Sequence, residues 1–133
     1  MINKNYSISK IEKFLHDRIV GAGIMTSDLI FLGSRPSVDV DKSKDAYLVI
    51  SIPSNVIDKN AYGSFIARIE IYVRDLTNGR KNINRLNAIH DQIFDLLPIK
   101  TNKYSFDLLS ELGEYDTLSY HATFINLDGI AKI

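Results

Sequence analysis

The sequence predicts an α+β fold, in which a mainly antiparallel sheet is covered on one face by two helices. Between Gly63 and Leu97 the hydrophobic period changes from two to nearly four. Apolar residues alternate over 65–73, which indicates a strand with one buried face, and the apolar residues over 83–97 follow helical spacing. The elements are expected in the order α-β-β-β-α-β-β, which favours two layers around one core.

The first half of the chain predicts one helix and two strands. Ser7 or Ser9 is placed to cap the first helix, and Gly21 is placed to end it in a left-handed conformation. A short apolar run over 29–32 predicts the first strand. The segment Tyr47–Ile52 is apolar at nearly every position, so a central strand with both faces covered is expected there.

Two connections in this half are polar, and the longer one runs from Gly33 to Asp45. It contains Pro36 and several charged residues, which predicts a loop or arm over 33–45. The other connection spans 53–62. At 133 residues the whole chain, 1–133, is expected to form a single domain.

The second half predicts the long strand, the second helix and two further strands. The turn Leu76-Thr77-Asn78-Gly79 leads to a helix over Ile83–Leu97, which Pro98 ends because proline disfavours helical backbone at the residue before it. Tyr104–Leu109 predicts a strand, and Glu111–Asp116 predicts a turn around Gly113. Alternation over 118–125 predicts the last strand.

The composition restricts the classes of function. Sixteen basic residues balance sixteen acidic ones, and this disfavours a nucleic acid as the main partner because phosphate binding usually requires a basic excess. The chain has no cysteine, which excludes disulfides, thiolate metal sites and a cysteine nucleophile. The start of the chain lacks an apolar core segment and the longest apolar run spans only 46–52, so neither a signal peptide nor a membrane segment is expected.

Catalytic and metal-binding motifs are not found in the sequence. His16, His90 and His121 fall in three different elements, and no pair has metal-ligand spacing. An aspartate follows both His16 and His90, but adjacent helical residues point about 100° apart, so neither aspartate is expected to orient its neighbouring ring. The aspartates of the 33–45 segment lack the glycine and glutamate of a calcium loop. We therefore expect no catalytic residue, no cofactor and no metal.

Two groups of residues are candidate contact surfaces. The first lies on the sheet face opposite the helices and consists of Arg68, Glu70, Tyr72 and Arg74. His121 and Thr123 are expected on the same surface. The second is the basic cluster Arg74, Arg80, Lys81 and Arg85. Positive charge at a helix start opposes the helix dipole at ~0.3–1 kcal/mol per charge, so the cluster is either a solvated helix start or a contact for an acidic surface or a phosphate backbone.

The layout resembles the tail-terminator, or tail-completion, proteins of long-tailed phages. The likeness rests on the long strand Ser64–Arg74, the turn Asp75–Gly79, the helix Ile83–Leu97 ending in Leu-Leu-Pro, and the polar segment Gly33–Asp45. It implies a structural protein that forms a homo-oligomeric ring, commonly a hexamer, which caps the tail tube and joins it to head-connector proteins. It also implies a location in the virion or the host cytoplasm, with Arg68, Glu70, Tyr72, Arg74, Arg80, Lys81 and Arg85 as candidate assembly contacts.

Two other classes of function remain open at the level of sequence. One is a small α+β binding module for a peptide or an RNA hairpin, whose element order partly matches the double-stranded RNA domain although the basic excess of that domain is missing. The other is a small enzyme that uses Glu70 or Asp107 with His121, which requires a pocket that joins them.

Overall fold

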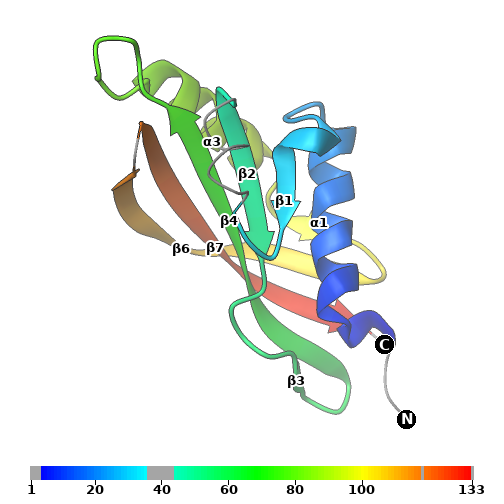
Figure 1. The fold of residues 1–133 in the computed structure, drawn as a ribbon. Helices are drawn as coiled ribbons and strands as arrows, with labels where there is room; N and C mark the ends of the chain where they lie inside the picture. The colour runs from blue at the N-terminus through cyan, green and yellow to red at the C-terminus, as the bar shows by residue number, and fades with distance from the viewer. Residues whose placement is uncertain (1–3, 36–43, 118, 133) are drawn as a thin grey trace.

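The computed structural model describes residues 4–35, 44–117 and 119–132, and for 112–117 it describes the backbone alone (Figure 1). A seven-stranded sheet forms one layer and two helices cover one of its faces, which confirms the predicted α+β class. The elements in chain order are η1 (Lys4–Tyr6), α1 (Ile8–Gly21), η2 (Ser27–Leu29), β1 (Ile30–Leu32), β2 (Ala46–Ser51), β3 (Ile57–Asp58), β4 (Tyr62–Arg74), α3 (Ile83–Leu96), β5 (Ile99–Lys100), β6 (Tyr104–Thr117) and β7 (Tyr120–Lys132).

The strands lie in the order β1-β2-β4-β7-β6-β5, and β3 pairs with β4 beside this path. The β1–β2 pair is parallel and every other pair is antiparallel. β4 and β7 pair along their whole length, from Tyr62 opposite Lys132 to Arg74 opposite Tyr120. Part of the predicted 33–45 arm, residues 36–43, lies outside the described residues.

The helix-covered face holds the main core. Ile11, Leu15 and Ile19 of α1 are buried there, and so are Leu86, Ile89 and Ile93 of α3. They pack against the odd-numbered residues 65–73 of β4, which are the apolar set that the alternation predicted. Because helical residues three and four apart share a face, each helix contributes a single buried stripe.

A second, smaller core lies on the opposite face, which we call the open face because α1 and α3 both pack on the other side of the sheet. Its buried members are Tyr47, Val49, Tyr72, Tyr120 and Ala122. Tyr47 and Leu48 are both fully buried although they point to opposite sides of β2. The prediction that this strand is covered on both faces is therefore confirmed.

Two local predictions for α1 are only partly right. Ser7 occupies the N-cap position but its side chain makes no capping hydrogen bond. Gly21 belongs to the helix, and the left-handed residue is instead Gly23, with φ of 73°. The N–H of Ile24 then donates to the carbonyl of Ile19 at 3.3 Å, so the reversal comes two residues later than predicted.

The predicted turn over Glu111–Asp116 is wrong, because β6 continues as a strand to Thr117. Its pairing with β7 shifts register between Leu108 and Ser110 and again between Leu112 and Tyr115. Such bulges insert extra residues into a strand without ending it, and a glycine inside a strand often marks one. The short strands β3 and β5 were not predicted, since two residues carry no periodicity.

Candidate functional site

The four residues predicted on the open face all lie there, because β4 keeps its alternation throughout. Arg68 lies opposite Ser51 and Asn126, and Tyr72 lies opposite Tyr47 and Ala122, all on the same side of the sheet. Their exposure differs, however. Tyr72 is only 3% exposed and belongs to the second core, so it is not available as a surface contact of the single chain.

Tyr72 is held by contacts on several sides. Its ring stacks on Tyr47, with centroids 4.7 Å apart, and the guanidinium of Arg35 lies 4.9 Å from its centroid. Its hydroxyl donates to Oε1 of Glu70 at 2.6 Å. Burial, with the hydrogen bond to Glu70 as the next cause, raises the pKa of Tyr72 far above its usual range. The phenol therefore stays protonated and fixes the position of Glu70.

The arginines of the open face lie over aromatic rings. The guanidinium of Arg68 is 5.6 Å from the ring centroid of Phe124, and its Nε donates to Oδ1 of Asn126 at 3.0 Å. The guanidinium of Arg74 lies 5.9 Å from the ring of Tyr120. Such contacts let a cation cover an apolar ring while keeping its charge at the surface. The open face thus carries ordered positive groups above an aromatic layer.

His121 and Thr123 do not join this surface, so their predicted placement is wrong. Their pairing partners on β4 are Val73 and Ile71, both in the helix-side core, and their side chains therefore point to the other face. There, Nδ1 of His121 lies 2.5 Å from Oδ1 of Asp75. The contact ties the end of β4 to the start of β7.

The residues of the hypothetical enzyme are not brought together. Glu70 bonds Tyr72 on the open face, whereas His121 lies on the helix-side face. Oδ2 of Asp107 is bound by Nζ of Lys100 at 2.9 Å. No pocket that the structure describes joins Glu70 or Asp107 to His121.

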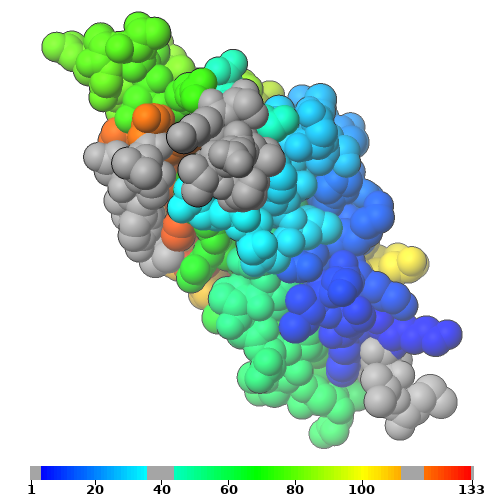
Figure 2. Space-filling view, in the orientation of Figure 1, coloured from blue at the N-terminus to red at the C-terminus, as the bar shows by residue number. Residues whose placement is uncertain are grey.

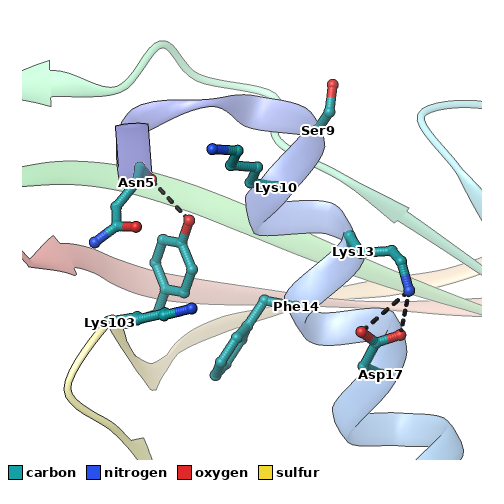
Figure 3. Close-up of a pocket in the computed structure, with 8 residues that line it drawn as sticks. Asn5, Ser9, Lys10, Lys13, Phe14, Asp17 and Lys103 are labelled. Carbon is teal, nitrogen blue, oxygen red and sulfur yellow. Dashed lines mark hydrogen bonds and ion pairs between the residues drawn. The ribbon is translucent and has the colours of Figure 1, made fainter. Parts of the chain in front are cut away.

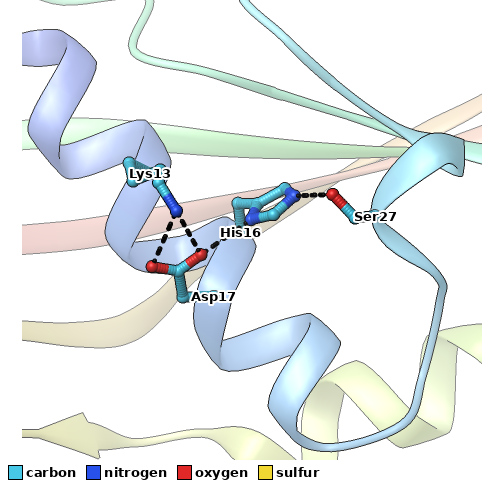
Figure 4. Close-up of polar contacts among 4 residues, drawn as sticks. All are labelled: Lys13, His16, Asp17 and Ser27. Atoms are coloured by element: carbon cyan, nitrogen blue, oxygen red, sulfur yellow. Dashed lines mark hydrogen bonds and ion pairs between the residues drawn. The ribbon is translucent and has the colours of Figure 1, made fainter.

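His16 and Asp17 do interact, contrary to the expectation for adjacent helical residues. Nδ1 of His16 lies 2.9 Å from Oδ1 of Asp17, and its Nε2 lies 2.8 Å from Oγ of Ser27 (Figure 4). The prediction considered only the directions of the Cα–Cβ bonds, and the atoms beyond Cβ can still turn toward each other. His90 makes the corresponding contacts to Asp91 and to Glu111, each at 3.3 Å.

Ser27, His16 and Asp17 are hydrogen-bonded in the same order as the serine, histidine and aspartate of a hydrolase triad. The surroundings of these residues, however, differ from those of a triad. A triad carboxylate is buried and serves the histidine alone. The Asp17 side chain is 57% exposed and also binds Nζ of Lys13 at 2.8 Å. This bond, more than the one to His16, lowers the pKa of Asp17. We interpret these hydrogen bonds as a structural contact that holds η2 against α1.

The basic cluster at the start of α3 is only partly assembled. Arg74 and Arg85 line one shallow hollow of about 520 Å³, together with Asp45 and Asp75. The carboxylates in that lining offset the positive charge of the arginines. Arg80 is exposed in the loop that precedes the helix, near the helix cap, where Oδ1 of Asn82 accepts from the backbone N–H of Arg85 at 3.2 Å.

A second basic site was missed by the sequence reasoning. A groove of about 530 Å³ runs between α1 and the β5–β6 turn, and Figure 3 shows its lining. Lys10, Lys13 and Lys103 contribute three ammonium groups, while Phe14 and Tyr104 supply aromatic surface. The lysines are far apart along the chain. The one local signal was Lys10, which lies in the first helical turn, where no acidic residue is found.

The sheet also has two unlike edges. Among the described residues, β1 pairs only with β2, and β6 pairs with β7 on one side but with β5 only at Ser105 and Phe106. Within the described part of the chain, residues 107–117 of β6 therefore have no strand on their outer side. Leu108 and Leu109, at 45% and 50% exposure, lie at this edge.

Among the described residues, no cluster of histidine, aspartate and glutamate is suited to hold a metal ion. No helix in the same residues combines the length and apolar character that crossing a membrane requires.

The sequence matches none of the protein-family models with which it was compared, and it has no significant match among curated proteins.

Proposed function

We propose that this chain is a structural subunit of a phage or prophage tail, of the tail-terminator type. In this role copies of the chain form a ring, a hexamer in the form that the resemblance implies, which caps the tail tube and joins it to the head connector. The observation that carries the proposal is that, among the described residues, the sheet ends in two unlike edges, which are β1 on one side and, beyond the two-residue strand β5, β6 on the other. A ring requires head-to-tail contacts, and these need two different surfaces on each subunit.

The β6 edge is suited to a specific contact. The unpaired backbone of residues 107–117 offers hydrogen-bonding groups, and the exposed Leu108 and Leu109 offer apolar area beside them. The bulge between Leu108 and Ser110 and the charges of Asp107 and Glu111 restrict which registers a neighbouring strand can adopt. Such restrictions favour one defined partner over indiscriminate strand pairing.

The β1 edge differs in length and chemistry. It is three residues long, parallel to β2, and carries the half-exposed Leu32. In a head-to-tail ring the β6 edge of one subunit would meet the β1 side of the next. The open-face residues Arg68, Glu70 and Arg74, with Arg80, Lys81 and Arg85 beyond them, are then candidates for contacts with the tube or the connector. Tyr72 acts beneath them by positioning Glu70.

The test is the solution mass, measured by light scattering coupled to size exclusion over a wide range of protein concentrations. A ring-sized species that negative-stain microscopy shows as a closed ring supports the proposal. We expect Leu108→Lys with Leu109→Lys to lower the mass, and Ile57→Lys, an exposed apolar residue on β3, to leave it unchanged. Open filaments or strict monomers that do not bind purified tail tubes would reject the proposal.

A peptide-binding module is the second candidate, favoured by the same β6 edge. An extended peptide can add a strand to an unpaired edge and gain affinity from backbone hydrogen bonds. This function predicts a monomer whose β6 amide signals shift when the peptide binds. The RNA form of this alternative predicts salt-dependent retention on RNA, and the zero net charge gives it no support.

A further inference from the structure

We infer that the groove beside α1 docks on the acidic end of α3 in a second copy of this chain. We call the first surface the lysine groove, formed by Lys10, Lys13 and Lys103 over Phe14 and Tyr104. The second surface, the acidic end, consists of Asp91, Asp95 and Glu111. The inference rests on the self-assembly in the proposed function and names one of its contacts.

The lysine groove has more positive charge than its own carboxylates can offset. Asp17 is the one acidic residue in its lining and it binds Lys13, with Nζ 2.8 Å from Oδ1. Lys10 and Lys103 form no ion pair with any described residue. The space-filling view places the start of α1, in blue, beside yellow atoms from the region of residue 100, so the two walls of the groove lie at the surface (Figure 2).

The floor of the groove offers apolar contact as well as charge. The rings of Phe14 and Tyr104 meet edge to face, with centroids 4.9 Å apart. The hydroxyl of Tyr104 donates to the backbone carbonyl of Asn5 at 2.9 Å, which anchors the ring at this end of the groove. Ile8, at 41% exposure, lies two residues before Lys10 and six residues before Phe14 along α1. A partner surface that combines carboxylates with apolar contact therefore fits the groove better than a free ion does.

The acidic end of α3 has the opposite character. The Asp91 side chain is 77% exposed, and Asp95 is exposed one turn later, in the last turn of the helix. The last turn contains no basic residue. Glu111, from β6, lies on the other side of His90, and its side chain is 45% exposed. Within the described residues, none of these three carboxylates pairs with a lysine or an arginine.

The helix dipoles strengthen both surfaces. The N-terminal end of α1 carries partial positive charge and lies beside Lys10, and the C-terminal end of α3 carries partial negative charge and lies beside Asp95. In each helix these charges are placed where the dipole makes them unfavourable in the isolated chain. When the two helix ends dock on each other, the positive charge at one end is placed beside the negative charge at the other, which offsets both unfavourable interactions. This charge complementarity favours a second copy of the chain as the occupant of the groove.

The other basic site is a weaker receptor for an acidic surface. The hollow at the start of α3 sets Asp45 and Asp75 beside Arg74 and Arg85, so its charge is largely balanced within one chain. The lysine groove sets three cations against one carboxylate that is already bound. An acidic partner therefore gains more by entering the lysine groove.

Lys10 and the end of α3 lie apart on one chain, so we place the contact between copies. Arg18 and Leu96 line a hollow where the ends of α1 and α3 meet, and Asp17 lines both this hollow and the lysine groove. Lys10 lies eight residues before Arg18, roughly 12 Å along the helix. A chain that presents unlike complementary surfaces associates head to tail, and such contacts close into a ring when the rotation between copies allows it.

The experiment uses two variants, in each of which the charge of one of the two contact surfaces is reversed. Variant one carries Lys10→Glu and Lys103→Glu, and variant two carries Asp91→Lys and Asp95→Lys. Each alone should raise the dissociation constant of the assembly about tenfold or more. Mixed together they should assemble again as alternating copies, because the intact groove of variant two meets the intact acidic end of variant one and the two altered surfaces are complementary in charge. A chain with all four substitutions should assemble again, because the charges are exchanged.

The matched control is Lys59→Glu, which removes an exposed lysine from the β3–β4 turn and should leave the mass unchanged. Melting temperatures establish that each variant folds, and a salt titration of the unmodified chain measures the electrostatic part of the contact without any substitution. Assembly that decreases as salt increases agrees with the inference.

The outcomes separate this inference from the proposed function. A ring that both variants still form overturns the docking contact and leaves the ring function standing. If the unmodified protein forms open chains or dimers and the variants form neither, the result supports the contact and rejects the ring. An unmodified chain that stays monomeric at every concentration overturns the docking of one copy on another.

Discussion

Replacing Gly129 with alanine tests the packing between the sheet and its core more sharply than any other single change. Gly129 lies in β7 directly between Phe65 of β4 and Phe106 of β6. A Cβ at this position would lie 2.2 Å from Cε2 and 2.4 Å from Cζ of Phe65. Because ordinary carbon contacts lie near 3.5–4.0 Å, the ring of Phe65 must move by more than an ångström.

The ring has little room to move, and this sets the size of the effect. Phe65 is 2% exposed, and its ring meets that of Phe106 edge to face at 5.7 Å between centroids. Overpacking of a closed core costs about 1–3 kcal/mol. For a chain of this length each kilocalorie per mole lowers the melting temperature by about 3–5 °C, so we expect a loss of at least a few degrees.

The assay is thermal unfolding by circular dichroism, with Gly21→Ala as the control. A Cβ at Gly21 meets nothing within 4 Å and its backbone is helical, so this substitution should be neutral or stabilising. In a Phe65→Leu background, Gly129→Ala should cost less, because the shorter side chain leaves space for the added methyl group. If the Gly129→Ala variant had the same melting temperature as the unmodified protein, the close approach of Phe65 to β7 would be refuted.

The remaining predictions concern the strand register, an alkaline transition and the basic loop. Ile71→Asp should prevent cooperative folding, because it places an unpaired charge at a fully buried position, and a soluble variant with an unchanged melting temperature would reject the register. The raised pKa of Tyr72 favours the neutral phenol in the folded chain, so its contribution is complete below about pH 10 and is lost as the pH rises further, with a slope of ~1.4 kcal/mol per pH unit. Tyr72→Phe should therefore make alkaline unfolding less steep, and equal slopes for the two proteins would contradict the assignment. Arg80→Glu with Lys81→Glu should keep the melting temperature and lower the solution mass, whereas an unchanged mass would make this cluster a solvated helix start.

Local periodicity predicted β4 and the two helices well, because each of them buries one regular stripe, whereas it predicted only part of β6 and β7. The alternation over 65–73 and the helical spacing over 83–97 describe β4 and α3 to within a few residues. The apolar run at 47–52 predicted a strand that is covered on both faces, as Tyr47 and Leu48 show. These signals depend on neighbouring residues, so they are readable without knowing the partners in space.

Periodicity did not reveal on which face a set of residues lies. His121 and Thr123 alternate correctly with their neighbours, but pairing with Val73 and Ile71 places them on the helix side. A shift of one residue in pairing exchanges the two faces, and only the hydrogen bonds to β4 fix that choice. The glycine in the 111–116 segment was likewise interpreted as a turn, whereas pairing with β7 makes the segment a bulged strand.

By itself, the sequence determined the α+β class, the two amphipathic helices and the long alternating strand. The reason is that an apolar stripe, which must be buried away from water, can be recognised from the spacing of neighbouring residues. The tertiary structure alone decided which side chains meet. It brought Tyr47, Tyr72 and Tyr120 from three strands into a second core, and it placed Lys10 and Lys103, ninety-three positions apart, on the walls of one groove. Such contacts depend on strand register and helix docking, which are set by the whole core and leave no mark in any single stretch of residues.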